Sequence, residues 1–165
     1  MIGSLLVAFL IHRHSRQVVE FNQKDFVKIL NASDAGIYVT LEGKPTSLVG
    51  HMGKPFALIA WASWCPSCGD QLHMLGHVAS ERSFPIIAVN RGETLGVAND
   101  FLRSIQRPEG LEYVVDTKDI VFSTMGGFAM PELIIYNAGG VETYHSRGTL
   151  TEEELRLALE KVNVK

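Results

Sequence analysis

The sequence has few cysteines and little excess charge of either sign, and both shortages limit its function. Its 165 residues include two cysteines, so a four-cysteine zinc site is excluded and the core must form without several disulfide bonds. The formal net charge is −3, and no basic run with interleaved aromatic residues occurs, so nucleic acid is not an expected partner. Repeats and low-complexity segments are absent, and the length suits one domain that buries about two-thirds of its unfolded surface.

No apolar run is long enough to cross a bilayer. The longest, Ile2 to Ile11, would span about 15 Å as a helix, half of a hydrocarbon core of about 30 Å. A signal peptide carries its positive charges before the apolar run, whereas here the basic residues follow it. These residues are His12, Arg13, His14 and Arg16.

Three interpretations of this N-terminus remain. Residues 1–16 are the end of a membrane anchor that starts upstream, a short interfacial helix, or a helix packed on the domain. We favour the truncated anchor. Residues 17–36 then form a linker or short helix, and residues 37–165 form the folded domain.

The two cysteines lie in the stretch Trp64-Cys65-Pro66-Ser67-Cys68, directly after an apolar run, Phe56 to Ala62, that predicts a buried strand. A helix is expected from Cys65 to about Glu81, with Pro66 suited to its first turn. Free backbone N–H groups and the helix dipole there stabilise a thiolate, and a second cysteine one turn later can attack a mixed disulfide. The pattern predicts thiol–disulfide exchange, with Cys65 as the exposed nucleophile and Cys68 as the buried resolving thiol.

Two cysteines at this spacing also have other possible roles. They could be inert core residues, or they could bind Cu(I) or Zn²⁺ together with His73 and His77, which share a helix face at positions i and i+4. That site would make the domain a metal carrier. The order of strand, cysteine pair and helix favours redox chemistry, and no metal or cofactor is expected.

Strand and helix patterns alternate along residues 37–165 and predict an α/β fold with a mixed central sheet, helices on both faces and an added N-terminal β-hairpin. Thr151 and Glu154 form a capping box that opens a terminal helix to about Val162. The expected strands are Ile37–Leu41, Thr46–Val49, Phe56–Ala62, Pro85–Asn90, Glu112–Val115, Glu132–Tyr136 and Val141–His145. The other expected helices are Asn99–Gln106 and Lys118–Met125.

These motifs carry a family resemblance. The segment FALIAWASWCPSC at 56–68 resembles the active-site strand and motif of thioredoxin-like proteins, and Met130-Pro131-Glu132 resembles the start of their cis-proline strand. The sequence is most similar to the membrane-tethered, extracytoplasmic TlpA, ResA and DsbE (CcmG) group. Three further segments add to the similarity: EGKPTSL at 42–48, MGKPF at 52–56 and YHSRGTLTEEEL at 144–155.

The resemblance implies a thioredoxin fold and a reductant of protein disulfides outside the cytoplasm. Such proteins often act on the CxxCH segment of apocytochrome c before haem attachment, and a membrane thiol transporter of the DsbD or CcdA type re-reduces them. We expect a membrane-anchored monomer. A generic cytosolic thioredoxin is the alternative, against which the N-terminal apolar run and the leading hairpin argue.

Substrate contacts are expected on both sides of the cysteines. The family pattern predicts a cis peptide bond before Pro131, which leaves the Met130 backbone free to pair with an extended substrate, while Trp64 and Pro66 flank Cys65. Without the resemblance, a trans proline opening an edge strand, with Met130 as core filler, would be favoured.

The chain departs from the family at the residues that move protons. Ile59 stands where thioredoxins have a buried Asp, and Gln71 stands where the ResA and DsbE group has a Glu. A Pro of the family is replaced by His73. Since Gln71 cannot titrate, either the second shell is uncharged or Glu132 or His73 carries the proton. The neighbouring Asp70 should face away from the thiols.

Overall fold

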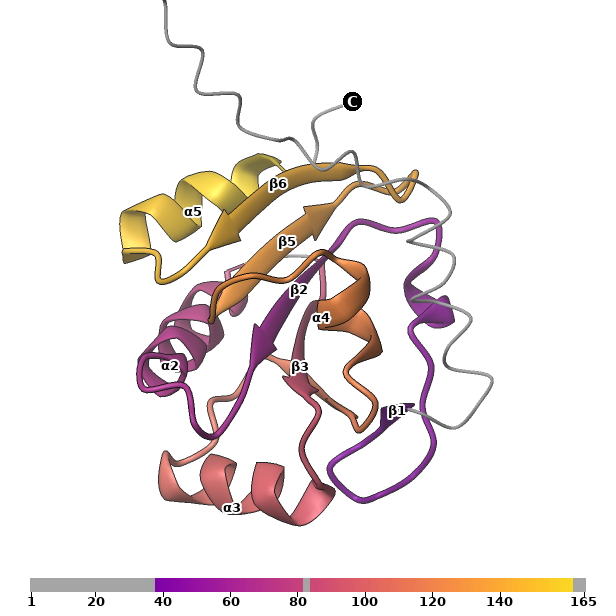
Figure 1. The fold of residues 1–165 in the computed structure, drawn as a ribbon. Helices are drawn as coiled ribbons and strands as arrows, with labels where there is room; N and C mark the ends of the chain where they lie inside the picture. Colours follow the sequence, from indigo (N-terminus) through magenta and orange to yellow (C-terminus); the bar gives the residue numbers. More distant parts are fainter. Residues whose placement is uncertain (1–37, 82–83, 162–165) are drawn as a thin grey trace, which may run out of the picture.

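The computed structural model describes residues 38–81 and 84–161, which form a six-stranded mixed sheet with helices on both faces (Figure 1). The strands are β1 (Tyr38–Val39), β2 (Phe56–Trp61), β3 (Ile86–Arg91), β4 (Glu112–Asp116), β5 (Glu132–Tyr136) and β6 (Glu142–Arg147). The helices are the 3₁₀ turn η2 (Val49–His51), α2 (Cys68–Ala79), α3 (Leu95–Ser104), α4 (Ile120–Thr124) and α5 (Glu152–Glu160). The expectations for residues 1–16 and 17–36 fall outside the described residues.

The strand order is β1-β4-β3-β2-β5-β6, with β2 in the interior. Strand β2 runs parallel to β3 and antiparallel to β5, and all six of its residues are buried, as its continuous apolar pattern predicts. Trp61 pairs with Asn90, so the carboxyl ends of β2 and β3 lie side by side at one edge of the sheet. The predicted α/β fold with a mixed sheet is confirmed.

Alternate residues of the sheet enter two separate cores. Ile59 and Trp61 belong to a cluster with buried residues of α2, α3 and α5, and both cysteines lie in it. Leu58 and Phe56 face the other way, into a cluster that includes Val121 of α4. This period-two division explains why β2 is apolar throughout. No helix in the described part of the chain is long and apolar enough to span a membrane.

The N-terminal hairpin is smaller than expected. Val39 forms an isolated bridge with Pro45, and Thr46 N donates to Tyr38 O over 2.9 Å, but 46–49 is not a strand and Val49 begins η2. The predicted second hairpin strand is therefore wrong. Pro45 has no N–H to extend the ladder, and β1 pairs instead with β4.

Several helix boundaries also differ. Helix α2 begins at Cys68, three residues later than expected, and α3 begins at Leu95, four residues earlier, where the Thr94 side chain caps it by accepting from Val97 N. The capping box of α5 is confirmed in both directions between Thr151 and Glu154.

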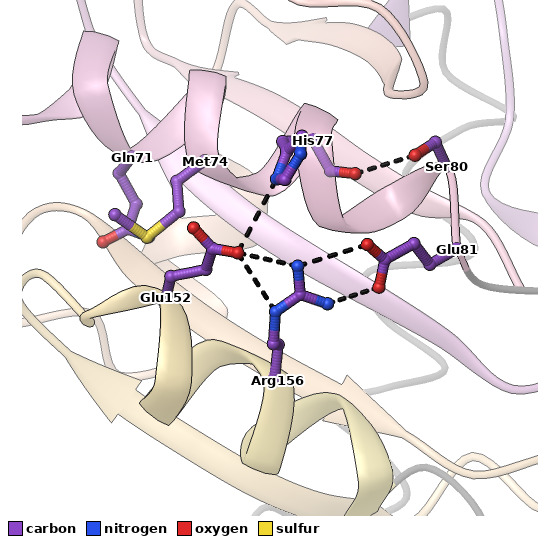
Figure 2. A network of polar contacts seen from close by, with 7 residues as sticks. All are labelled: Gln71, Met74, His77, Ser80, Glu81, Glu152 and Arg156. Atoms are coloured by element: carbon purple, nitrogen blue, oxygen red, sulfur yellow. Dashed lines mark hydrogen bonds and ion pairs between the residues drawn. The ribbon is translucent and has the colours of Figure 1, made fainter.

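Polar contacts tie α2 to α5, and Figure 2 shows them. Arg156 of α5 binds Glu81 beyond the end of α2 and also Glu152, with a distance of 2.7 Å between Arg156 Nη2 and Glu152 Oε1. His77 Nδ1 lies 3.7 Å from the same Glu152 oxygen. Exposed ion pairs of this kind add little stability each, but the network links α5 to the helix that carries the active site.

Candidate active site

The cysteine pair occupies the turn between β2 and α2. Cys65 N donates to Ala62 O and Cys68 N donates to Cys65 O, each over 3.2 Å, so two successive turns precede the helix. The two sulfurs form a disulfide with an S–S distance of 2.02 Å. The structure therefore describes the oxidised state of the pair.

Two expectations about this turn are wrong. Cys65 and Pro66 precede the helix instead of opening it, because Ser67 is the N-cap residue. Cys65 is not exposed in this oxidised state either: its residue is 3 % accessible, against 0 % for Cys68, because both belong to the core cluster under α2. Cys65 still lies near the positive end of α2.

Exposed side chains surround this turn. The Trp64 side chain is 60 % exposed, and Pro66 is exposed beside it. Arg91, at the end of β3, places its guanidinium carbon 5.6 Å from the centroid of a Trp64 ring and 3.5 Å from the Phe122 ring centroid. Asp119 fixes that guanidinium, with a distance of 2.5 Å between Arg91 Nη2 and Asp119 Oδ2. Arg91 thereby connects Trp64 to Asp119 and Phe122.

The Met130–Pro131 peptide bond is cis, as the resemblance implied. Ala60 pairs with Glu132, so Pro131 follows the same register toward the end of β2, where the cysteines lie. Met130 is half-buried and packs against the cluster that contains Cys65 and Cys68. Register and packing thus place Met130 and Pro131 at the end of β2 from which the cysteine segment leaves the sheet.

Glu132 is completely buried and has polar partners on two sides. Its Oε2 accepts from Phe128 N over 3.1 Å, and its Oε1 contacts His145 Nε2 and lies 3.3 Å from Arg147 Nε. The residue after it, Leu133, belongs to the cysteine-side core, so the Glu132 side chain lies on the opposite sheet face. This position favours a role in fixing residues 128–132 over proton transfer to the thiols.

His145 lies against two carboxylates, Glu132 and Glu142. Burial lowers its pKa, but hydrogen bonds to Glu132 and Glu142 outweigh burial and raise the pKa to about 9. The imidazole is therefore protonated at neutral pH and balances the buried carboxylate.

The sequence is similar to those of known thiol–disulfide exchange proteins. The chain is 24 % identical over 147 residues to the thiol-disulfide oxidoreductase ResA of Geobacillus thermodenitrificans, covering 86 % of this chain and 82 % of that one. It is 26 % identical over 113 residues to the thiol:disulfide interchange protein DsbE of Escherichia coli K12, covering 66 % of this chain and 60 % of DsbE. These similarities to ResA and DsbE support the resemblance to the TlpA, ResA and DsbE group of thioredoxin-like thiol–disulfide oxidoreductases.

The fold is similar to that of solved structures as well. One is a secreted Mycobacterium tuberculosis disulfide oxidoreductase homologous to E. coli DsbE, with a TM-score of 0.65, 20 % identity, and coverage of 74 % of this chain and 92 % of that chain. No protein-family model matches the chain.

The two departures from this family have clear structural settings. Ile59 is buried in the same cluster as both cysteines, so an apolar side chain replaces the thioredoxin carboxylate. Gln71 is also buried, on the same face of α2 as Cys68, and its Oε1 accepts from Leu150 N over 2.7 Å. Asp70 is exposed, as expected. Gln71 therefore has a structural partner in the connection from β6 to α5.

The histidines of α2 are arranged differently from a metal site. His73 and His77 are exposed; His73 Nε2 lies 2.6 Å from Ile105 O, and His77 faces Glu152. Among residues 38–81 and 84–161, no group of three His, Cys, Asp or Glu side chains is placed to bind a metal ion. The metal-carrier alternative finds no support in the described part of the chain.

Sequence reasoning missed several polar residues at the carboxyl ends of the strands. Asn90 is fully buried, and Glu93 binds both Asn90 and Ser63. Arg91 supports Trp64, as described above. The available signal was the sudden change from apolar to polar residues at the end of a predicted strand, which is where α/β proteins place functional groups.

Restoring the family carboxylate at position 71 should alter titration more than stability. We expect Gln71→Glu to raise the apparent pKa of Cys65 by about one unit, because a buried negative charge opposes thiolate formation. The Glu can still accept from Leu150 N, so the fold should be kept. The measurement is the pH dependence of Cys65 alkylation. Asp70→Asn is the matched control, since its exposed side chain faces away; superimposable curves for Gln71→Glu and the native protein would contradict the prediction.

Proposed function

We propose that the protein reduces disulfide bonds of protein substrates outside the cytoplasm. The observation that carries this proposal is the Cys65–Cys68 disulfide in the turn after β2, packed in one cluster with Met130 beside the cis bond to Pro131. Thiol–disulfide exchange is the chemistry of the family. The reducing direction and the compartment are the parts proposed here.

The reaction needs the two thiols and no bound cofactor. In the reduced protein, the Cys65 thiolate attacks one sulfur of the substrate disulfide, and the other sulfur leaves as a thiolate that takes up a proton. The Cys68 thiol then loses its proton, and the resulting thiolate attacks Cys65 Sγ and releases the second substrate sulfur as a thiolate. Two electrons pass to the substrate, and the protein ends in the disulfide state that the structure describes.

Two walls would bind the substrate around the cysteines. Trp64 and Pro66 form one wall and Met130 and Pro131 the other, where the Met130 backbone can pair with an extended substrate segment. Phe128 adds to the second wall, because its side chain is 87 % exposed while its N–H is held by Glu132. An exposed aromatic ring on a fixed backbone can contact apolar groups next to the substrate cysteine.

The partners and the compartment follow from the family. We propose an extracytoplasmic, membrane-anchored monomer that takes electrons from a membrane thiol transporter of the DsbD or CcdA type. The oxidised CxxCH segment of an apocytochrome c is the proposed substrate. A secreted structural neighbour and DsbE among the relatives support this proposal.

Insulin reduction tests the central activity. With dithiothreitol as the electron source, the purified protein should accelerate the precipitation of insulin chains, and His73→Ala with His77→Ala should keep most of that activity. Both histidines are exposed and outside the cysteine cluster. Failure to accelerate insulin reduction, or stoichiometric copper or zinc that is lost in the double variant together with the activity, would contradict the proposal and favour a metal carrier.

The direction and the substrate need two further measurements. The protein should be equilibrated with glutathione buffers of known redox potential. At a potential where an oxidant of the DsbA kind is mostly reduced, this protein should be mostly oxidised, because a reductant has a lower reduction potential than an oxidant. An oxidised CxxCH peptide should be reduced with a higher kcat/KM than insulin. Equal kcat/KM values for the two substrates would contradict apocytochrome c as the specific substrate. They would still agree with a general protein-disulfide reductase.

A further inference from the structure

One carboxylate holds the turn that leads into the cysteine motif. Ser63 N donates to Glu93 Oε2 over 2.9 Å, and Ser63 Oγ donates to Glu93 Oε1 over 2.5 Å. Ser63 lies two residues before Cys65, in the turn closed by the hydrogen bond from Cys65 N to Ala62 O. Both carboxylate oxygens are thus committed to the segment that places the nucleophile.

The sheet explains why Glu93 reaches Ser63 across thirty residues of sequence. Strands β2 and β3 are parallel and adjacent, so the segments that follow them leave the same edge. The loop after β3 is itself fixed, because Gly92 N donates to Asp116 O over 2.8 Å and Gly92 adopts a φ of 67°. Glu93 therefore projects from a fixed loop next to the turn of Ser63.

A buried amide completes the arrangement. Asn90 is 0 % exposed, and its Nδ2 donates to Glu93 Oε2 over 2.6 Å. Its Oδ1 has no hydrogen-bond partner in the described structure. Three donors converge on one carboxylate, and charge-assisted hydrogen bonds of this kind have strict geometry. Such a cluster fixes position better than packing alone.

We propose that Glu93 is the positioning residue of the active-site turn, acting through Ser63 to hold Cys65 in its reactive geometry. The inference rests on the proposed thiol–disulfide exchange, and it deepens that function by naming the group that orients the nucleophile. Glu93 acts on Cys65 only through its hydrogen bonds to Ser63. Its carboxylate acts by accepting hydrogen bonds.

Positioning and electrostatics predict opposite changes in the reaction rate of Cys65 when Glu93 is substituted. A negative charge near Cys65 disfavours the thiolate, so removing the charge alone would speed the reaction of Cys65 at neutral pH. Loss of the hydrogen bonds would instead free the turn to move and slow the reaction of Cys65, because small displacements of a reacting group lower its reaction rate. The direction of the change therefore separates the two effects.

The experiment compares Glu93→Ala and Glu93→Gln in the reduced protein. The measured quantity is the second-order rate constant of Cys65 with iodoacetamide, under conditions where circular dichroism shows each variant to be folded. Glu93→Ala should be slower by about tenfold. Glu93→Gln should stay within about threefold of the native protein, because its Oε1 can accept from Ser63 while the Asn90 amide rotates to offer its free Oδ1 to the new Nε2.

Glu112→Gln is the matched control. Its carboxylate is bound by one described partner, His51 at 3.3 Å, and it lies at the first residue of β4, at the other end of the parallel strands. The control should leave the rate constant unchanged. Ser63→Ala is the second variant if Glu93→Ala does not fold: it removes only the Oγ bond, and it should slow alkylation by a smaller factor than the loss of the carboxylate.

Two results would overturn the inference. Faster alkylation in both Glu93 variants would show that the carboxylate acts by its charge, which disfavours the Cys65 thiolate. Unchanged alkylation in folded Glu93→Ala and Ser63→Ala would leave Glu93 with a role in stability only. The proposed function fails separately, when the native protein does not reduce insulin. A dependence of Cys65 reactivity on Glu93 in that case would still support the positioning role.

Discussion

Cys65→Ser is expected to lower kcat/KM for a protein disulfide by at least about a thousandfold, which corresponds to about 4 kcal/mol of transition-state stabilisation. Serine cannot form a thiolate at neutral pH, so the first exchange step is lost. Cys68→Ser should also stop turnover, but at a later step: Cys65 can still attack, and the mixed disulfide accumulates because no thiol resolves it. The measurement is turnover on insulin together with non-reducing gel electrophoresis of each variant mixed with substrate.

The assignment of the two roles depends on this difference between the variants. In the oxidised structure both cysteines are buried, so exposure does not separate them. Limited alkylation of the reduced native protein provides the control, and the adduct should map to Cys65, which precedes α2, while Cys68 is the first residue within it. Labelling mainly at Cys68, with mixed disulfides trapped by Cys65→Ser, would reverse the roles.

The sequence alone predicted the elements whose signals lie within a few neighbouring residues. Strand β5 has the bounds Glu132–Tyr136 that its apolar run predicts, and the capping box at Thr151 sets the start of α5. The site cysteines were found for the same reason, since both lie in one five-residue motif. In each case, residues close together in the sequence were enough to predict the feature.

The predicted starts of α2 and α3 were wrong because tertiary contacts outweighed local helix preference there. Helix α3 starts at Leu95 although Gly96 follows at once, because Ala98 and Leu102 bury themselves against the sheet. Helix α2 starts late because the disulfide segment forms its own turns first. A proline that suits a first helical turn also suits a β-turn, so Pro66 did not decide between them.

The polar residues after β3 could be suspected from the sequence, but their partners could not be predicted. Glu93 and Ser63 are thirty positions apart, and nothing in their spacing distinguishes Glu93 from the other acidic residues of the chain. Only the register of β2 with β3 brings them together. In the same way, Glu132 was identified as a candidate from the family motif, but its partners His145 and Arg147 depend on the pairing of β5 with β6.

Glu132→Ala is expected to give the largest loss of stability among the substitutions considered, about 3–5 kcal/mol, because removing one partner of a buried ion pair leaves the others uncompensated. His145 and Phe128 N would both lose their acceptor. Glu132→Gln should cost less, since its amide oxygen can still accept from Phe128 N. The measurement is urea unfolding of each variant at about pH 6, with Asp100→Asn as the control, because its pair with Arg103 is on the surface and contributes about 0.5 kcal/mol or less.

The same cluster makes stability depend on pH, with a sign fixed by His145. Its pKa of about 9 in the folded protein exceeds the ordinary value of 6.5, so its contribution is complete below about pH 6.5 and is lost as the pH rises through 9. The shift corresponds to about 3 kcal/mol. Native protein should therefore unfold more easily at pH 9.5 than at pH 6, and Glu132→Gln should show a smaller difference because only Glu142 still raises the histidine pKa. Equal pH dependence in both proteins would show that Glu132 does not hold the proton on His145.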